Sequence, residues 1–231
     1  MPPARSNFPS VERLRETAEG QGCLSGFMIP PLLALVVGIS FLSFLSQFSP
    51  GVDASATGPT NTGAGTTAGI SPIFTPEVQY WGKQITQWAA EYNLDPNLVA
   101  TVMQIESCGN PDAQSSAGAM GLFQVMPFHF TIFDDPYDPN TNAHRGLAYL
   151  KRSLAAAGGD PALALAGYNG GISVIGWPQS NWAAETQRYI YWGAGIYTDA
   201  ASGASESQRL NEWRSHAGGM CGRAREKLGL P

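Results

Sequence analysis

An uncharged apolar segment divides this chain into two parts that must fold in different surroundings. It covers residues 27–48, FMIPPLLALVVGISFLSFLSQF, and a helix needs about 20 apolar residues to cross a bilayer. Three arginines precede the segment, whereas no Lys or Arg follows it until Lys83. Because basic flanking residues stay on the cytoplasmic side, we expect a single-pass cell-membrane protein with residues 1–26 in the cytoplasm and the rest outside.

A cleavable signal peptide is the alternative for the same segment. Residues 54–56, Ala-Ser-Ala, have the small-x-small form that signal peptidases accept. However, the apolar run is longer than the roughly 7 to 15 residues of a signal-peptide core, and the residues before it include three glutamates. These features favour a retained anchor, and with either alternative the remainder of the chain is exported.

Residues 49–72 predict a flexible linker. They consist almost entirely of Gly, Ala, Ser, Thr and Pro, which give a packed core nothing to bury. The whole chain has a net charge of −5 and three lysines. We therefore expect no nucleic-acid binding, which requires a basic patch.

Helical periodicity begins after the linker. Val78, Trp81, Ile85 and Trp88 recur at steps of three to four residues, which predicts a helix that ends near residues 92–93. Asp95 before Pro96 is typical of a helix start, and this second helix should end at Glu106. Further helices are expected over residues 142–157, 161–169, 185–197, 206–215 and 220–228.

No run of alternating apolar and polar residues predicts a strand, so the fold class is mainly α. We expect a domain over residues 73–200 and a helical tail, residues 201–231, packed on it.

Glu106 is the candidate acid. It shares a helical face with Val99 and Met103, and burial against apolar side chains raises the pKa of a carboxyl group. A carboxyl that stays protonated near neutral pH can act as a general acid in glycoside cleavage. The alternative is an exposed glutamate, which the helix dipole disfavours at a helix C-terminus.

The sequence offers no obvious second carboxylate, although most glycosidases need one. Asp134, Asp135 and Asp138 lie in a proline-rich loop, where formation of turns explains them. A single carboxylate suffices when the N-acetyl group of the substrate stabilises the cationic sugar. Glu106 therefore indicates an enzyme for 2-acetamido sugars that needs no cofactor.

We expect no metal site. The three histidines, His129, His144 and His216, are far apart and lack Cys or His partners at ligand spacing.

Residues 106–127, ESCGNPDAQSSAGAMGLFQVMP, resemble the signature of the transglycosylase SLT domain, a lytic transglycosylase family of the lysozyme-like (α+β lysozyme) superfamily. The resemblance implies a bacterial enzyme whose partner is the peptidoglycan glycan strand. It implies cleavage of the β-1,4 bond between MurNAc and GlcNAc without water, which leaves 1,6-anhydroMurNAc ends. Glu106 would act first as acid and then as base.

The same resemblance implies roles for further residues of this segment. Ser115 would contact the N-acetyl group, and Gln124 and Met126 would line the saccharide cleft. The structural positions would be Gly118, Gly121 and Pro127.

Two shorter segments are similar to the same family. Residues 166–171, AGYNGG, imply that Tyr168 faces Glu106 and that Asn169 borders the sugar. Residues 185–190, ETQRYI, imply that Glu185 and Tyr189 contact the substrate. For the second segment, an ordinary helix start with Tyr189 in the core is the alternative.

Cys108 and Cys221 both follow the apolar segment, so they would lie outside, where disulfides persist. Either they form a disulfide or they are two buried free thiols. Cys23 precedes the apolar segment, so a lipid anchor is not indicated.

Two other functions are compatible with these patterns. A lysozyme-type hydrolase (muramidase) would use Asp134 or Asp135 to activate water. A non-catalytic peptidoglycan-binding module of an envelope complex would be expected to lack Glu106 or Ser115, and both are present. No protein partner is indicated.

Overall fold

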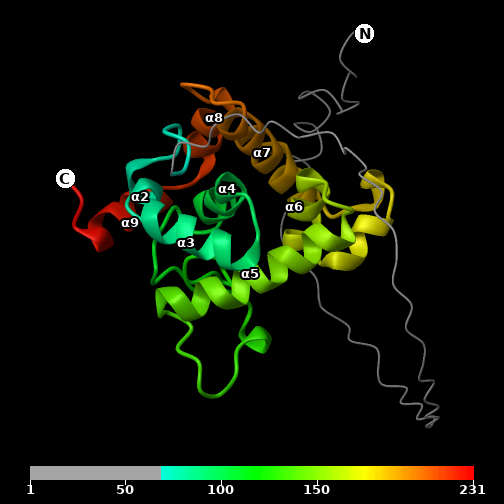
Figure 1. Ribbon diagram of the computed structural model, residues 1–231, viewed down its shortest axis with the longest axis horizontal. Helices are drawn as coiled ribbons and strands as arrows, with labels where there is room; N and C mark the ends of the chain where they lie inside the picture. The colour runs from blue at the N-terminus through cyan, green and yellow to red at the C-terminus, as the bar shows by residue number, and fades with distance from the viewer. Residues whose placement is uncertain (1–68) are drawn as a thin grey trace, which may run out of the picture. The chain divides into compact units, whose positions relative to one another are not determined.

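The computed structural model describes residues 69–231, which form a mainly helical domain (Figure 1). Residues 1–26, the apolar segment 27–48 and most of the expected linker lie outside the described residues. Among residues 69–231, no helix is long and apolar enough to cross a membrane. The α-helices are α2 (Pro76–Gln79), α3 (Gly82–Tyr92), α4 (Pro96–Glu106), α5 (Pro139–Ala156), α6 (Pro161–Gly170), α7 (Ala184–Ala201), α8 (Gln208–His216) and α9 (Met220–Leu228), and the 3-10 helices are η1 (Pro127–His129), η2 (Ile172–Gly176) and η3 (Gln179–Asn181).

The first expected helix is broken into α2 and α3. Trp81 lies at the break, where its indole nitrogen donates a 2.9 Å hydrogen bond to the carbonyl of Gly109. The sequence missed this break because the partner lies 28 residues away. The predicted end of the helix is confirmed, since Asn93 adopts a left-handed conformation after Tyr92 (φ 52°).

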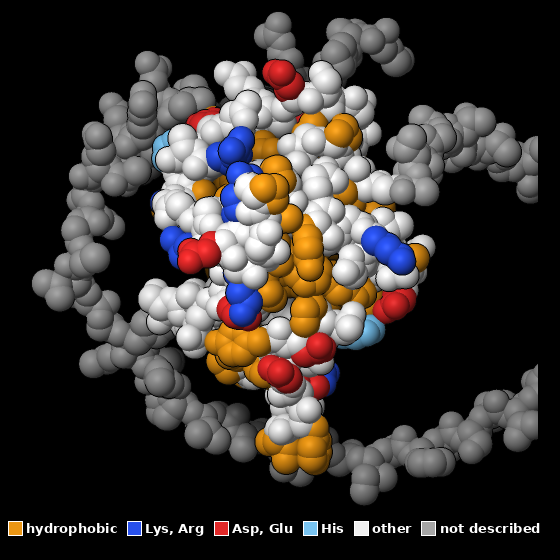
Figure 2. All heavy atoms as spheres, turned by 90° about the vertical axis from the view of Figure 1, so that its left-hand side faces the viewer, with side chains coloured by type: hydrophobic (Ala, Val, Ile, Leu, Met, Phe, Trp, Pro, Cys, Tyr) orange, Lys and Arg blue, Asp and Glu red, His pale blue; other side chains and the backbone are white. Residues whose placement is uncertain are grey.

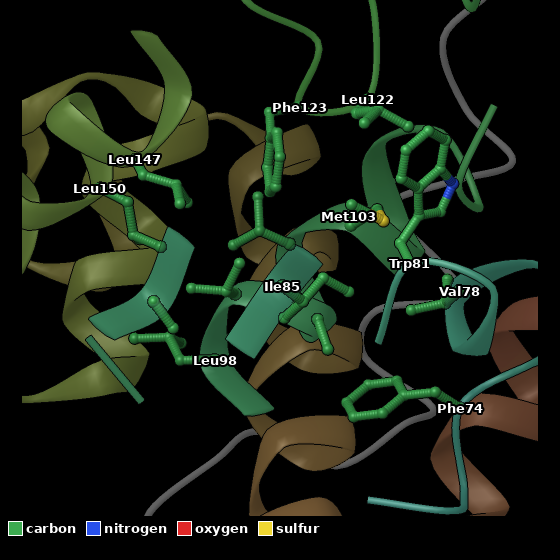
Figure 3. Close-up of a cluster of buried hydrophobic side chains, with 14 of the residues drawn as sticks. Phe74, Val78, Trp81, Ile85, Leu98, Met103, Leu122, Phe123, Leu147 and Leu150 are labelled. Atoms are coloured by element: carbon green, nitrogen blue, oxygen red, sulfur yellow. The ribbon is translucent and has the colours of Figure 1, made fainter. Parts of the chain in front are cut away.

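Helix α4 is the central helix, and both of its predicted ends are confirmed. The side chain of Asp95 accepts a hydrogen bond from the backbone of Asn97, Pro96 opens the helix, and Glu106 is its last residue. Side chains from α3, α5 and the α4–α5 loop converge on α4 (Figure 3). The largest fully buried side chains of this core include Ile85, Leu98, Met103, Leu122, Phe123, Leu147 and Leu150.

Helix α5 begins three residues earlier than expected because Asp138 caps it. The Asp138 carboxylate accepts a 2.8 Å hydrogen bond from the backbone of Thr141. Helix α6 begins at Asp160 and Pro161 as predicted. Helix α7 continues past Tyr197 to Ala201, which is longer than the expected helix.

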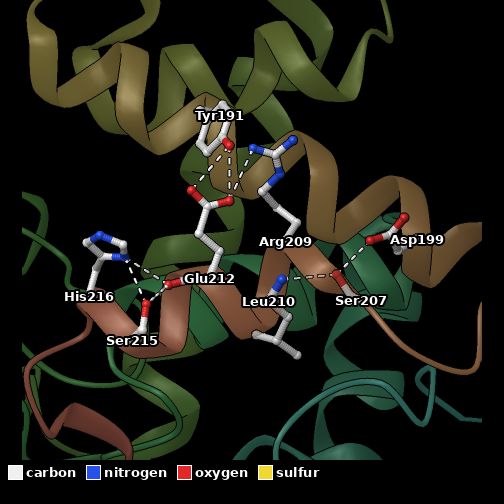
Figure 4. A network of polar contacts seen from close by, with 8 residues as sticks. All are labelled: Tyr191, Asp199, Ser207, Arg209, Leu210, Glu212, Ser215 and His216. Atoms are coloured by element: carbon white, nitrogen blue, oxygen red, sulfur yellow. Dashed lines mark hydrogen bonds and ion pairs between the residues drawn. The ribbon is translucent and has the colours of Figure 1, made fainter. Parts of the chain in front are cut away.

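The tail forms α8 and α9, which pack on different helices. On α8, Leu210 and Trp213 are buried in the core, and Glu212 accepts a hydrogen bond from Tyr191 of α7 (Figure 4). The Arg209 guanidinium lies 3.5 Å from the centre of the Tyr191 ring. The last helix, α9, contacts α2.

Candidate functional site

The loop after α4 is fixed to the end of that helix by Ser107. The Ser107 hydroxyl is fully buried and donates a 2.7 Å hydrogen bond to the carbonyl of Leu122. The same hydroxyl accepts a 3.1 Å bond from the backbone of Gly109. In this loop Met120 makes isolated β-bridges with Gln114 and Val125, so residues 107–126 fold back beside Glu106 without a continuous strand.

Asn142 of α5 organises this loop from the other side, and sequence reasoning missed it. Its side chain accepts a 2.8 Å hydrogen bond from the backbone of Phe123, and it donates to the carbonyls of Met120 (2.8 Å) and Pro136 (2.9 Å). Asn142 is fully buried. The only signal in the sequence was a polar residue on the inward face of an expected helix.

The two glycines that we expected to be structural have left-handed backbones, with φ of +87° at Gly118 and +74° at Gly121. A side chain at Gly121 would also collide with the Asn142 amide. Glycine is the residue that adopts such conformations without strain. Pro127, the third expected structural position, opens η1 and is exposed.

Glu106 is half-buried where α4 ends. Burial raises the pKa of Glu106 to about 8, and the negative charge of Glu185 acts in the same direction. The Tyr189 hydroxyl lies beside the carboxyl and opposes this rise, although the two groups do not form a full hydrogen bond. The carboxyl is therefore protonated at neutral pH, as a general acid must be.

Helices α6 and α7 place two tyrosines near this carboxyl. The Glu106 charge and burial raise the pKa values of both Tyr168 and Tyr189, with burial the larger cause. The Tyr168 hydroxyl donates a 2.7 Å hydrogen bond to the carbonyl of Phe123, which ties α6 to the loop. Tyr189 is 6% exposed and its hydroxyl has no partner among the described residues.

The other expected site residues take part in local contacts. Asn169 accepts a 2.9 Å hydrogen bond from the Thr186 hydroxyl. The Ser115 hydroxyl accepts a 2.9 Å bond from the backbone of Ala119. Gln124 donates from its side-chain amide to the carbonyls of Ala113 and Gly121, so this amide nitrogen braces the loop.

Met126 is half-buried and directly precedes η1. Glu185 is exposed in the first turn of α7. It is the only other carboxylate whose charge acts on Glu106 among residues 69–231. The resemblance implied a substrate contact for Glu185 but not an effect on Glu106.

Three aspartates near the end of the α4–α5 loop, Asp134, Asp135 and Asp138, make structural contacts. Asp134 forms a 2.6 Å ion pair with Arg145, and hydrogen bonds from the backbone of Thr131 and from Arg145 hold the pKa of Asp134 low. Asp135 accepts a bond from the backbone of Tyr137, and Asp138 caps α5. Each acid is thus accounted for by the loop fold.

Cys108 and Cys221 form a disulfide in the structure, across a sequence separation of 113 residues. Together with Glu77 they are the only group of three possible metal-ligand side chains within residues 69–231. Disulfide sulfurs are not thiolates, and the thiolate is the form that ligates a metal. The disulfide therefore leaves no thiolate in this group to ligate a metal.

Comparison with known proteins associates this geometry with one family. Residues 83–190 match the family model described as Transglycosylase SLT domain. The chain is 43% identical over 111 residues to a protein named Transglycosylase from Enterobacteria phage PRD1, covering 47% of this chain and 40% of that protein. It is 30% identical over 83 residues to Membrane-bound lytic murein transglycosylase E of Buchnera aphidicola (subsp. Acyrthosiphon pisum), covering 30% of this chain and 38% of that protein.

The chain thus spans less than half the length of either relative. Among solved structures, an X-ray structure of an inactive mutant of lytic transglycosylase Slt from Pseudomonas aeruginosa is 23% identical. It covers 64% of this chain and 24% of that chain, with a TM-score of 0.39.

Proposed function

We propose that this chain, whose residues 83–190 are a transglycosylase SLT domain, is a peptidoglycan lytic transglycosylase with a lysozyme-like fold. The observation that carries the proposal is the environment of Glu106. This residue ends a buried helix, its pKa is raised to about 8, and it is the carboxyl beside Tyr189. The family match supports peptidoglycan as the substrate, and we take the bond between MurNAc and GlcNAc as the bond that is cleaved.

The first chemical step is proton transfer from Glu106 to the oxygen of the scissile glycosidic bond. The bond between C1 of MurNAc and that oxygen breaks, and the GlcNAc end leaves as an alcohol. The N-acetyl group of the same MurNAc stabilises the cationic C1, as in substrate-assisted glycosidases. Ser115 would orient that group, and Gln124, Met126 and Asn169 would line the saccharide cleft.

The second step uses the carboxylate that the first step leaves behind. Glu106 takes the proton from the C6 hydroxyl of MurNAc, and O6 attacks C1 to close the 1,6-anhydro ring. The enzyme returns to its protonated state and no water is consumed. Burial of the Glu106 carboxyl favours its protonated form between turnovers, and the Tyr189 hydroxyl opposes this effect only in part.

A lysozyme-type hydrolase is the second candidate, and one observation favours it. The charge of Glu185 acts on Glu106, so a second carboxylate is close enough to be considered as the base that activates water. Two-carboxylate glycosidases need such a pair. The products of the two reactions differ by one water.

We also propose that residues 27–48 anchor the chain in the cell membrane with residues 1–26 in the cytoplasm and the domain outside. The sequence supports this through the uncharged run and the arginines before it. Peptidoglycan lies outside the cell membrane, so this arrangement puts the domain beside its substrate. Protease treatment of intact spheroplasts tests it, because only an exported domain would be digested.

The deciding experiment is mass spectrometry of muropeptides released from purified peptidoglycan by the full-length chain, with Glu106→Gln alongside. Anhydro products, one water lighter than lysozyme fragments and absent with the variant, are expected. Reducing-end products would show a hydrolase and direct attention to Glu185. Binding of peptidoglycan without any product would show a non-catalytic wall-binding module.

A further inference from the structure

A row of aromatic rings leads away from Glu106 across three structural elements. It consists of Tyr168 on α6, Tyr149 on α5, and His129 and Phe128 on η1. The distances between neighbouring ring centres are 5.8 Å, 5.0 Å and 4.5 Å. Tyr168 forms the end of the row next to Glu106, and the charge of Glu106 raises the pKa of Tyr168. We call these four residues the aromatic row.

The outer part of the row is open to solvent. Tyr168, Tyr149 and His129 are half-buried, whereas Phe128 is 74% exposed. The loop that continues from Phe128 projects below α5 in Figure 1, and Figure 2 shows apolar side chains at its tip. Exposed apolar side chains that adjoin one another mark binding surfaces more often than isolated ones do, so packing alone does not explain the row.

A cation accompanies the row at its midpoint. The guanidinium of Arg152, one turn after Tyr149 on α5, lies 5.2 Å from the centre of the Tyr149 ring. Arg152 is exposed and forms no ion pair with residues 69–231. Arg145 on the same helix is paired with Asp134. The positive charge beside the row is therefore available to a ligand.

We propose that the aromatic row binds the glycan strand beyond the bond being cleaved, with a sugar ring on Phe128 and Tyr149 and an acidic substituent of the strand paired with Arg152. This inference rests on the proposed function, because it extends the same cleft. The apolar faces of sugar rings pack on aromatic faces, which bury large areas with few rotatable bonds. Burial and Arg152 lower the pKa of His129, which favours the neutral form of its ring.

The carboxylate has two possible sources, the lactyl group of MurNAc and the stem peptide attached to it. Both present the planar acid that a guanidinium binds through two hydrogen bonds. Chitooligosaccharides carry neither acid. A set of three ligand classes therefore separates stacking from charge pairing and identifies the source of the charge.

The test is calorimetric titration of the full-length Glu106→Gln chain, which cannot cleave its ligands. The ligands are chitooligosaccharides of two and six sugars, a peptide-free MurNAc-GlcNAc hexasaccharide, and the same hexasaccharide with stem peptides. Each is titrated into the parent, into Phe128→Ala and into Arg152→Ala. Tyr80→Ala is the matched control, because Tyr80 is 50% exposed and lies outside the aromatic row.

We expect Phe128→Ala to weaken all six-sugar ligands about fivefold, in line with about 1 kcal/mol for one aromatic contact, and to leave the disaccharide unchanged. Arg152→Ala should weaken only ligands with a carboxylate. If Arg152→Ala binds both MurNAc-containing hexasaccharides more weakly, the carboxylate that pairs with Arg152 is the lactyl group. If only the hexasaccharide with stem peptides binds more weakly, that carboxylate belongs to the stem peptide. Unchanged affinities in both variants overturn the proposal, as does an equal loss with Tyr80→Ala.

Failure of the proposed function gives a different result. If the chain does not recognise peptidoglycan at all, the Glu106→Gln parent itself binds none of the glycans. If the chain is a hydrolase or a wall-binding module, the parent binds them but the unsubstituted chain releases no anhydro products. The variants remove surface side chains, and substitutions of this kind usually change stability by less than about 0.5 kcal/mol. Thermal unfolding of each variant verifies that a loss of binding is not a loss of fold.

Discussion

Cys221 of the last helix is joined by a disulfide to Cys108, two residues after Glu106. Cys108 is fully buried and has a left-handed backbone (φ 52°). The Gln104 side chain, one turn earlier on α4, donates a 3.1 Å hydrogen bond to the Cys108 sulfur. The tail is thus covalently attached next to Glu106, where α4 ends.

Removing this disulfide should destabilise the domain strongly. A crosslink that closes a loop of more than 100 residues stabilises by roughly 4 to 5 kcal/mol in the chain-entropy model. We expect Cys108→Ser with Cys221→Ser to lower Tm by about 10 °C. Cys23→Ser, which removes the remaining cysteine of the sequence, is the control. Peptide mapping without reductant should recover the crosslinked pair, and two free thiols there would contradict the prediction.

The activity should have an alkaline limit set by Glu106. Its pKa is raised to about 8, and the proposed first step needs the protonated form. Above that pH, kcat/KM should fall about tenfold for each pH unit. A profile that stays flat to pH 10 would show that Glu106 is not the acid of the limiting step.

Two neighbours should move this limit in opposite directions. The Tyr189 hydroxyl favours the charged carboxylate, so Tyr189→Phe should raise the pKa of Glu106 and move the limit to higher pH. Glu185 disfavours the charged form, so Glu185→Gln should move it to lower pH. The readout is the midpoint of the alkaline limb of kcat/KM, because loss of a packing contact alone would lower the rate without moving the midpoint. Shifts in the same direction would contradict this electrostatic account.

The raised pKa also predicts how stability depends on pH. A carboxyl whose pKa is higher in the folded state than in the unfolded state stabilises the fold below the unfolded value, and that contribution is lost as pH rises through the folded value. For Glu106 the window runs from 4.5 to about 8. The Tm of Glu106→Gln minus that of the parent should therefore increase between pH 5 and pH 9. A constant difference would contradict the raised pKa.

Local signals in the sequence were sufficient for most helix ends. Asp95 and Asp160 cap helices through their own neighbours, so a short window contains all the information. The break at Trp81 was missed because its cause is the carbonyl of Gly109, 28 residues away. Helix starts fixed by nearby caps were predictable, whereas interruptions caused by tertiary hydrogen bonds were not.

In the candidate site, too, features that depend on nearby residues were predictable, whereas features that depend on tertiary packing were not. The apolar face of α4 indicated that Glu106 would be shielded from water, and the structure agrees. The influence of Glu185 depends on how α7 packs against α4, which periodicity does not specify. Asn142 was missed for a similar reason, since its three partners come from the loop before α5.

Replacing Asn142 should damage the loop that lies beside Glu106. Asn142→Ala would leave the backbone N–H of Phe123 and the carbonyl of Pro136 unpaired, whereas the Met120 carbonyl keeps its hydrogen bond from the backbone of Val125. Each buried polar group left unpaired costs about 1 to 3 kcal/mol, so we expect a loss of about 3 to 5 kcal/mol in urea unfolding. Asn181→Ala, at an exposed position in η3, should change stability by less than about 0.5 kcal/mol. Similar losses in the two variants would contradict this role.

The destabilisation caused by Gly121→Ala should depend on Asn142. The added Cβ would collide with the Asn142 amide and lie 2.9 Å from the carbonyl of Pro136. In the double variant Gly121→Ala/Asn142→Ala the first collision disappears, so the combined destabilisation should be smaller than the sum of the two single losses. A strictly additive double variant would mean that backbone strain at φ +74° alone disfavours the alanine.

The ion pair between Arg225 of α9 and Glu77 of α2 should contribute much more to stability than the ion pair that Lys227 of the same helix forms with Asp112. Arg225 Nε lies 2.7 Å from the Glu77 carboxylate, whose side chain is 3% exposed. Burial alone would raise the pKa of Glu77, but hydrogen bonds from its own backbone and from Arg225 outweigh burial and lower it. Arg225→Met leaves this carboxylate buried without its cation, which typically costs about 3 to 5 kcal/mol.

The loss of stability in Arg225→Met should depend on pH. A carboxylate whose pKa is lower in the folded state stabilises the fold above its unfolded pKa, and this stabilisation is lost as pH falls. The loss in the variant should therefore be large at pH 7 and smaller below pH 4.5. Lys227→Met is the control, because Lys227 and Asp112 are both about half exposed and such pairs contribute about 1 kcal/mol or less. Urea unfolding of both variants at pH 7 and pH 4 makes the comparison, and an equal loss at pH 7 would show that the tail helix is held by its disulfide and packing instead.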